Sequence, residues 1–218
     1  GRGRVASLVE GTDDALYGTA FGGFTNSLGG VFKMNKDGSG FAVLKSFAAN
    51  ADARNPAAGL VKGGNGVLYG TAFKGSATNN LSGTNWGAVF RINENGGGYK
   101  VVRSLSELPA GRNPVASLAL ASDGALYGTA PVGGDMGLGT LFSLAEPPSF
   151  TGLQLASDGA WLQFQGVSSR TYGVQATTNL APTFWQTLGG SVTWTNGQFQ
   201  FLDSDATNVP AKFYRAVR

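Results

Sequence analysis

The phrase LYGTA occurs three times in this chain, at residues 16–20, 68–72 and 126–130. Each copy is followed by a second apolar segment, which reads GVFKMN, AVFRIN or GTLFSL. Because the same segments recur in the same order, we interpret them as copies of one structural unit. The phrase therefore recurs because each copy poses the same packing problem.

The spacing of the copies shows where they differ. Tyr17 and Tyr69 are 52 residues apart and Tyr69 and Tyr127 are 58 apart, whereas Phe32 to Tyr69 and Phe90 to Tyr127 are both 37. The six-residue difference lies in the loop after LYGTA, which has 10 residues in the first copy and 16 in the second. A single variable loop in a constant frame is typical of a repeat scaffold.

Alternating side chains indicate strands: Phe32 and Met34 share one face, and Lys33 and Asn35 share the other. Four short strands in each copy, joined by turns rich in Asp, Asn and Gly, predict an all-β fold of propeller-like, four-stranded repeats. A solenoid of stacked β layers is the alternative. The positions expected to pack this scaffold are Tyr17, Tyr69, Tyr127, Phe32, Phe90 and Phe142.

The segments LYGTA, GGVFKMNKDGSGFAVLKSF and NPAAGLV resemble the GloVer tandem repeats of large bacterial surface or secreted proteins, common in Verrucomicrobia-like lineages. The resemblance covers about residues 3–145. It implies propeller-like repeats in an extracellular or cell-surface protein of bacteria, and it transfers no catalytic residue. The first copy departs from the pattern, with Gly3 and Arg4 where the other copies have Asn-Pro.

The last third of the chain has a different pattern. Seven short candidate strands lie between GLQLA and KFYRAVR, and this segment is similar to a small β-sandwich of the fibronectin type III or immunoglobulin kind. The proline-containing stretch AEPPS is the expected linker. We therefore predict a repeat domain at 1–146 and a sandwich at 147–218, with Trp161, Trp185 and Trp194 in the sandwich core.

One segment of the expected sandwich repeats a phrase from the third copy. LQLASDGA at 153–160 matches LALASDGA at 118–125 in seven of eight positions. It is either a convergent strand–turn–strand or a relic of a fourth repeat. The following WLQFQG breaks the LYGTA pattern and favours the first interpretation.

The composition excludes many classes of enzyme. The chain has no His and no Cys, and therefore lacks the usual general base, thiolate nucleophile and zinc ligands. A net charge of +3, divided between both halves, gives no nucleic-acid footprint, and no apolar run is long enough for a membrane span. We predict a protein that is not an enzyme and has no cofactor and no metal site.

Four groups of residues are candidates for chemistry or binding. Asp203 and Asp205 could form the carboxylate pair of a glycosidase, but strand-end and loop roles are favoured. Asn35, Asp37 and Ser39 loosely match a calcium loop, and turn chemistry explains them better. Trp86, with Thr84 and Asn85 in the inserted loop, could stack on a sugar or contact a protein, or pack back onto its own repeat. Arg54 and Arg112 could pair with carboxylates of neighbouring repeats, but a solvated surface role is favoured.

The repeat domain cannot close a ring alone, because closed propellers have about four to eight blades and this chain has three copies, the last without its fourth strand. Uncovered edges and apolar flanks then need a partner. The partner would be further repeats of a longer parent chain, or copies of this chain in a homo-oligomer or filament. The expected function is structural or adhesive, with self-association through exposed blade edges into a filament or surface layer. The alternative is a module of a larger secreted surface protein that binds a glycan, such as polysaccharide, or a protein.

Overall fold

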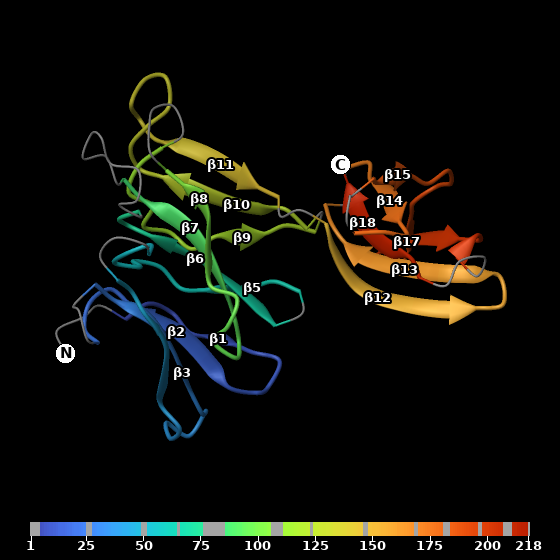
Figure 1. Cartoon of the computed structure of the whole chain (residues 1–218). Coiled ribbons are helices and arrows are strands. Elements are labelled where there is room, and N and C mark those ends of the chain that lie inside the picture. Colours follow the sequence, from blue (N-terminus) through green and yellow to red (C-terminus); the bar gives the residue numbers. More distant parts are fainter. Residues whose placement is uncertain are drawn as a thin grey trace. The chain divides into compact units, whose positions relative to one another are not determined.

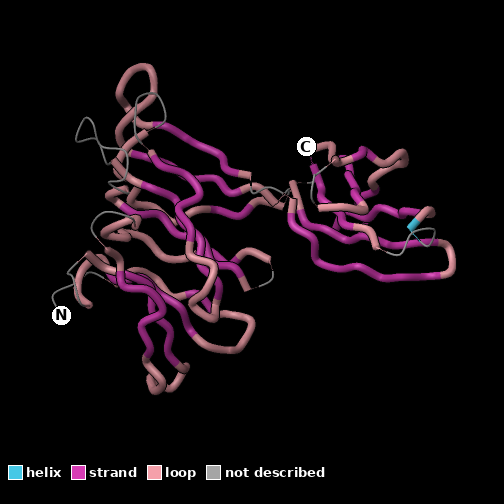
Figure 2. Tube along the Cα trace, viewed as in Figure 1, coloured by secondary structure: helices cyan, strands magenta, loops and turns pink. Residues whose placement is uncertain are grey.

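The computed structural model describes residues 5–24, 28–48, 52–64, 66–75, 86–105, 111–122, 124–145, 148–167, 170–180, 184–195, 198–206 and 211–217. These residues form β-strands and loops, with a short 3₁₀ turn at Ala206 (Figure 2). The chain divides into two compact units. Residues 1–121 with 126–144 form the first, which we call the repeat unit, and residues 122–125 with 145–218 form the second unit. The predicted all-β class is confirmed, and among the described residues no helix is long and apolar enough to span a membrane.

The first copy forms one antiparallel sheet, which we call the first repeat sheet (Figure 1). Its strands follow chain order: β1 (Val9–Glu10), β2 (Leu16–Ala20), β3 (Gly30–Met34) and β4 (Ala42–Ser46). The LYGTA phrase is β2, at an inner position, where both strand edges are hydrogen-bonded. In the β3–β4 turn, Asp37 accepts hydrogen bonds from the backbone N–H (2.9 Å) and hydroxyl (2.7 Å) of Ser39.

The second copy repeats this plan with the same register. Its strands are β5 (Val61–Lys62), β6 (Val67–Ala72), β7 (Ala88–Asn93) and β8 (Lys100–Ser104), again in chain order. Phe90 lies opposite Gly70, as Phe32 lies opposite Gly18 in the first sheet, and both sheets have a β-bulge beside this phenylalanine. The six-residue insertion has therefore left the pairing of the strands unchanged.

The third copy has three strands in its sheet: β9 (Ala119–Leu120), β10 (Leu126–Ala130) and β11 (Thr140–Leu144). Phe142 lies opposite Gly128, which keeps the shared register. In all three sheets the strands pair within one copy, and the described sheets do not close on themselves. Strand pairing in the described repeat sheets is thus confined to single copies.

The repeat sheets stack face against face. Tyr17, Val31 and Phe47 of the first sheet form one core with Leu68 and Phe90 of the second. A second core joins Tyr69, Val89 and Leu105 to Leu118, Leu126 and Phe142 of the third sheet. The short first strands also adjoin, β1 beside β5 and β5 beside β9. We call each contact between consecutive sheets a sheet joint.

The second unit has two antiparallel sheets around one core. One contains β12 (Ser149–Ala156), β13 (Gly159–Gln165), β17 (Gln198–Asp203) and β16 (Thr193–Thr195), and the other β15 (Gln186–Thr187), β14 (Gly173–Thr177) and β18 (Phe213–Val217). Each of the seven candidate segments contains one strand. The LQLASDGA segment lies in the β12–β13 hairpin of the four-stranded sheet.

The predicted tryptophan core of this unit is wrong. The buried side chains are Leu162, Phe164, Tyr172, Val174, Phe199 and Phe201. On β13, Trp161 falls between buried Ala160 and Leu162, so the alternation of the strand turns it to the other face. Trp194 is 42% exposed and lies with its ring 4.6 Å from that of Phe199, at the margin of the core.

Candidate interaction surfaces

The glycine of LYGTA is required by a ring that lies over it. A Cβ at Gly70 would lie 2.5 Å from the Phe90 ring and 3.0 Å from Leu60. At Gly18 the corresponding contacts are Phe32 and Leu8, and at Gly128 they are Phe142 and Leu118. Each sheet thus places one phenylalanine and one leucine directly on its glycine. The phrase keeps a glycine because any side chain there would displace the ring.

The threonine of LYGTA ties one sheet to the next. The Thr19 hydroxyl donates a 2.8 Å hydrogen bond to the carbonyl of Ala58 in the second sheet. The Thr71 hydroxyl donates in the same way to the carbonyl of Ala116, at 3.0 Å. Both threonines are fully buried. The two acceptors are equivalent positions, as are the two donors, so both sheet joints use the same polar contact.

We expect the isosteric change Thr71→Val to lower the free energy of unfolding of the repeat unit by about 1 kcal/mol, because the buried Thr71 side chain would lose its hydrogen bond to the Ala116 carbonyl. Urea titration measures the loss, and the matched change Thr129→Val, at the exposed third threonine, should change the stability of the monomer by less than about 0.5 kcal/mol. Equal losses at both sites would contradict a role for Thr71 in the joint.

The Asn-Pro corner also reaches back to the preceding sheet. The Asn55 side chain donates to the carbonyl of Phe21 at 2.9 Å, and Asn113 donates to that of Phe73 at 2.9 Å. Both asparagines have positive φ, of 55° and 53°, a conformation that asparagine tolerates better than most residues. In the first copy Gly3 stands at this position, outside the described residues.

A buried carboxylate adds to the first joint. Glu94 accepts hydrogen bonds from the backbone N–H of Thr12, at 2.9 Å, and from its hydroxyl. Glu94 follows β7 in the second sheet, and Thr12 lies in the β1–β2 turn of the first. Sequence analysis missed this contact because a turn glutamate next to Asn-Gly looks like a solvated surface residue.

The third sheet exposes the face that the other sheets bury. We call it the trailing face, formed by Tyr127, Thr129, Leu141 and Ser143. Leu141 is 68% exposed, whereas the equivalent Val31 and Val89 are both 0% exposed. Thr129 is likewise exposed, and Tyr127 is only half-buried. Among the described residues of the repeat unit, no further sheet packs against this third copy of the LYGTA face.

The first sheet exposes the opposite face. We call it the leading face, formed by the exposed Leu8, Phe41 and Val43 around the buried Phe32. Leu8 is 44% exposed, whereas its equivalents Leu60 and Leu118 are 6% and 4% exposed. Phe41 is 57% exposed, although the equivalent Tyr99 is half-buried and packs on Phe47.

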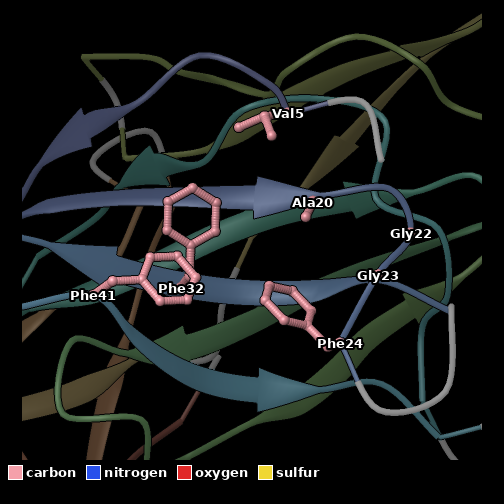
Figure 3. Close-up of a pocket in the computed structure, with 7 residues that line it drawn as sticks. All are labelled: Val5, Ala20, Gly22, Gly23, Phe24, Phe32 and Phe41. Carbon is pink, nitrogen blue, oxygen red and sulfur yellow. The ribbon is translucent and has the colours of Figure 1, made fainter. Parts of the chain in front are cut away.

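An apolar pocket of about 310 Å³ lies on this leading face. Phe24, Phe32 and Phe41 line it together with Val5, Ala20 and two glycines (Figure 3). The rings of Phe32 and Phe41 lie 5.3 Å apart. Sequence analysis missed the pocket, although one signal was present: Phe41 aligns with Tyr99, which needs a neighbouring sheet to cover it.

Trp86 packs back onto the repeat unit. Its side chain is half-buried, and the Arg112 guanidinium lies 4.7 Å from the centre of its ring. The carbonyl of Trp86 accepts a hydrogen bond from the backbone N–H of Asn113. The second predicted arginine, Arg54, donates to the carbonyl of Gly75 at 3.4 Å. Thr84 and Asn85, predicted beside Trp86, lie outside the described residues.

The two acidic candidates of the sandwich do different things. Asp203 is buried, forms an ion pair with Lys212 at 2.6 Å and accepts a hydrogen bond from the Tyr214 hydroxyl at 2.8 Å. Burial opposes ionisation of Asp203, but the hydrogen bonds from Lys212 and Tyr214 outweigh it and lower its pKa below the usual value. Asp205 is exposed and donates its backbone N–H to Asp203. Asp203 is thus a structural carboxylate.

No group of three or more acidic side chains that could hold a metal ion occurs among the described residues. Asn35, Asp37 and Ser39 bond to one another: the Asn35 amide donates to the Ser39 hydroxyl at 2.9 Å, and Asp37 caps the turn. Tyr17 of the first LYGTA phrase also bonds to a turn carboxylate, since its hydroxyl donates to Asp13 at 2.8 Å. Burial and this contact raise the pKa of Tyr17.

Comparison with known proteins agrees with this repeated architecture. No curated protein matches the chain. The Gloeobacter/Verrucomicrobia repeat family matches residues 1–183, which include all three LYGTA sheets and the first strands of the second unit. The chain therefore belongs to the Gloeobacter/Verrucomicrobia repeat family.

Proposed function

We propose that this chain is a non-enzymatic structural repeat protein that acts by self-association, outside the bacterial cell or on its surface. The observation that carries the proposal is the pair of uncovered faces on the repeat unit. Leu141 and Phe41 are large apolar residues, and each is more than half exposed at a position whose equivalents are covered. Apolar faces of this kind mark sites of protein association.

The uncovered faces of the repeat sheets support the proposal better than the edges of their outer strands do. Strand β11 pairs with β10 on one side and is an edge strand of the third sheet, and the Arg103 guanidinium of the second sheet donates to its Ser143 carbonyl at 2.9 Å. The same guanidinium lies 5.6 Å from the ring of Phe142. A capped edge is a poor template for strand addition. The trailing and leading faces are thus the surfaces assigned to self-association.

The chemistry of the described side chains fits a structural role. Asp203, the buried candidate carboxylate, is engaged by Lys212 and Tyr214. A glycosidase would need a carboxylic acid with a raised pKa near a second carboxylate. The proposal therefore assigns no catalytic residue. The extracellular location rests on the family and on a low content of charged residues, 13%.

Sedimentation velocity over a wide range of protein concentration tests the proposal. We expect the mass to rise above the 22.4 kDa of one chain as concentration increases. The double variant Phe41→Glu/Leu141→Glu, altered only at exposed side chains, should remain at 22.4 kDa. A wild-type mass that stays at 22.4 kDa at every concentration would contradict the proposal.

A binding module of a larger surface protein is a second candidate, which the phenylalanine-lined pocket favours. If the pocket takes a glycan or peptide, Phe41→Ala should reduce retention on the ligand at least tenfold. Trp86→Ala should have little effect, because Arg112 already covers its ring. Retention on immobilised polysaccharides, with Trp86→Ala as the matched control, distinguishes the two sites. Equal retention by all three proteins would remove this candidate.

A further inference from the structure

The two uncovered faces are the two halves of one sheet joint. Within the chain, each joint sets a trailing face, with its LYGTA tyrosine and threonine, against a leading face with its leucine and phenylalanine. The joint occurs twice, between the first and second sheets and between the second and third. The third sheet has a trailing face left over, and the first sheet has a leading face left over.

The polar groups of the leftover faces also correspond. In the internal joints, Thr19 donates to the carbonyl of Ala58, and Thr71 donates to that of Ala116. Thr129 is the third donor of this series, and it is exposed. The acceptor position of the first sheet, one copy before Ala58, is Ala6. A donor and an acceptor of the same contact thus stand at opposite ends of the repeat unit.

We infer that a second copy of this chain docks head to tail, with the trailing face of one repeat unit against the leading face of the next. In this joint the Thr129 hydroxyl of one copy donates to the carbonyl of Ala6 of the other. Leu141 takes the place of Val31 and Val89, and lies against the leucine and phenylalanine of the leading face. This inference rests on the proposed function and specifies which surfaces meet.

The choice of a second copy follows from the continuity of the joint. A face that repeats an internal interface is complementary to the opposite face of the same chain. Because the two faces differ, the contact is heterologous, and repeated docking produces a ring or an open chain of subunits. Two copies bring six repeat sheets together, within the range of about four to eight found in closed propellers.

The joint between copies is smaller than the internal joints. In the first joint, Phe47 packs on Phe90 and Tyr99 with ring centres 5.3 and 5.7 Å apart. Phe47 follows the fourth strand, and the described part of the third sheet ends at its third strand. Gly3 also lacks the amide by which Asn55 and Asn113 hold the preceding sheet. We therefore expect association that depends on concentration.

Two single variants test the inference. Leu141→Glu places a charge on the trailing face, and Phe41→Glu places one on the leading face; burying either charge in the joint is strongly unfavourable. Each variant alone retains one intact face, but two molecules of the same variant cannot form the joint. We expect each variant to sediment as a 22.4 kDa monomer at concentrations at which the wild type associates.

The decisive sample is the equimolar mixture. Head-to-tail docking predicts that the mixture recovers a heterodimer of two chains and no larger species, because the two intact faces meet once. Unchanged thermal unfolding of each variant confirms that the faces, and not the fold, were altered. The inference would be overturned if the wild type associates and one of the single variants also associates in the absence of the other. Such a result would indicate a face that pairs with its own copy. A wild type that never associates refutes the proposed function instead.

Discussion

Replacing Gly70 with valine is expected to destabilise the repeat unit by about 3 kcal/mol, because overpacking a filled core forces side chains and backbone apart. The Cβ would lie 2.5 Å from the Phe90 ring, and the ring is fully buried between two sheets. Leu60 closes the other side at 3.0 Å. Chemical denaturation followed by tyrosine and tryptophan fluorescence measures the loss.

The matched control is Gly97→Ala, in the β7–β8 turn of the same sheet. Its Cβ would meet only the side chain of Asn95, 3.1 Å from the amide oxygen, and both residues are exposed. We expect a change below about 0.5 kcal/mol for the control. If Gly70→Val is as stable as this control, then the ring can move aside at little cost and the packing account of LYGTA is wrong.

The second large effect is expected in the other unit, at Lys212. Removing the ammonium group by Lys212→Met leaves the Asp203 carboxylate buried without its ion-pair partner, which costs about 3 kcal/mol or more. The loss should be confined to unfolding of the two-sheet unit, since Asp203 and Lys212 both belong to it. Stability at pH 7 can be compared with that of Asp205→Asn, an exposed carboxylate that should tolerate the change.

The same pair predicts a pH dependence. The pKa of Asp203 is lower in the folded state than in the unfolded state, so its ionisation stabilises the fold above about pH 4. This contribution is lost as the pH falls through the folded pKa and the carboxylate becomes protonated. The stability gap between wild type and Lys212→Met should therefore shrink below about pH 4. A gap that stays constant from pH 7 to pH 3 would exclude the ion pair as its cause.

The repeat plan could be predicted from the sequence because its signals are local. The recurring phrases and the constant spacing from Phe32 to Tyr69 and from Phe90 to Tyr127 place equivalent strands in each copy. The structure has these strands, and the third sheet has the three that the sequence supports. The turns of Asp37 and Asn95 likewise follow from short polar side chains next to glycine.

Contacts between sheets could not be predicted in this way, because they join residues far apart in the chain. The alternation of a strand places Thr71 on one face but does not say that the Ala116 carbonyl lies opposite. The outward position of Trp161 has the same origin: its size suggested the core, but the register of β13 gave the inner positions to Leu162 and Phe164. Residue type alone does not determine on which face of a strand a side chain lies.

The most direct test of the joint uses the absence of cysteine from the natural sequence. Positions 7, 59 and 117 are equivalent in the three copies; a Cβ at Gly59 would lie 2.3 Å from the Ser7 hydroxyl oxygen, so that Ser7 would have to shift, and 3.5 Å from the Ser117 hydroxyl oxygen. Equivalent positions thus meet across each joint. The double variant Gly59→Cys/Ser117→Cys should form a disulfide within one chain and serves as the geometric control.

The measurement is disulfide formation in a mixture of two single variants, Ser7→Cys and Ser117→Cys, separated on a non-reducing gel and identified by peptide mass. The account predicts that the Ser7→Cys chain is joined to the Ser117→Cys chain in preference to either homodimer. A mixture that yields only homodimers, or no cross-linked species when the control has closed, would contradict it.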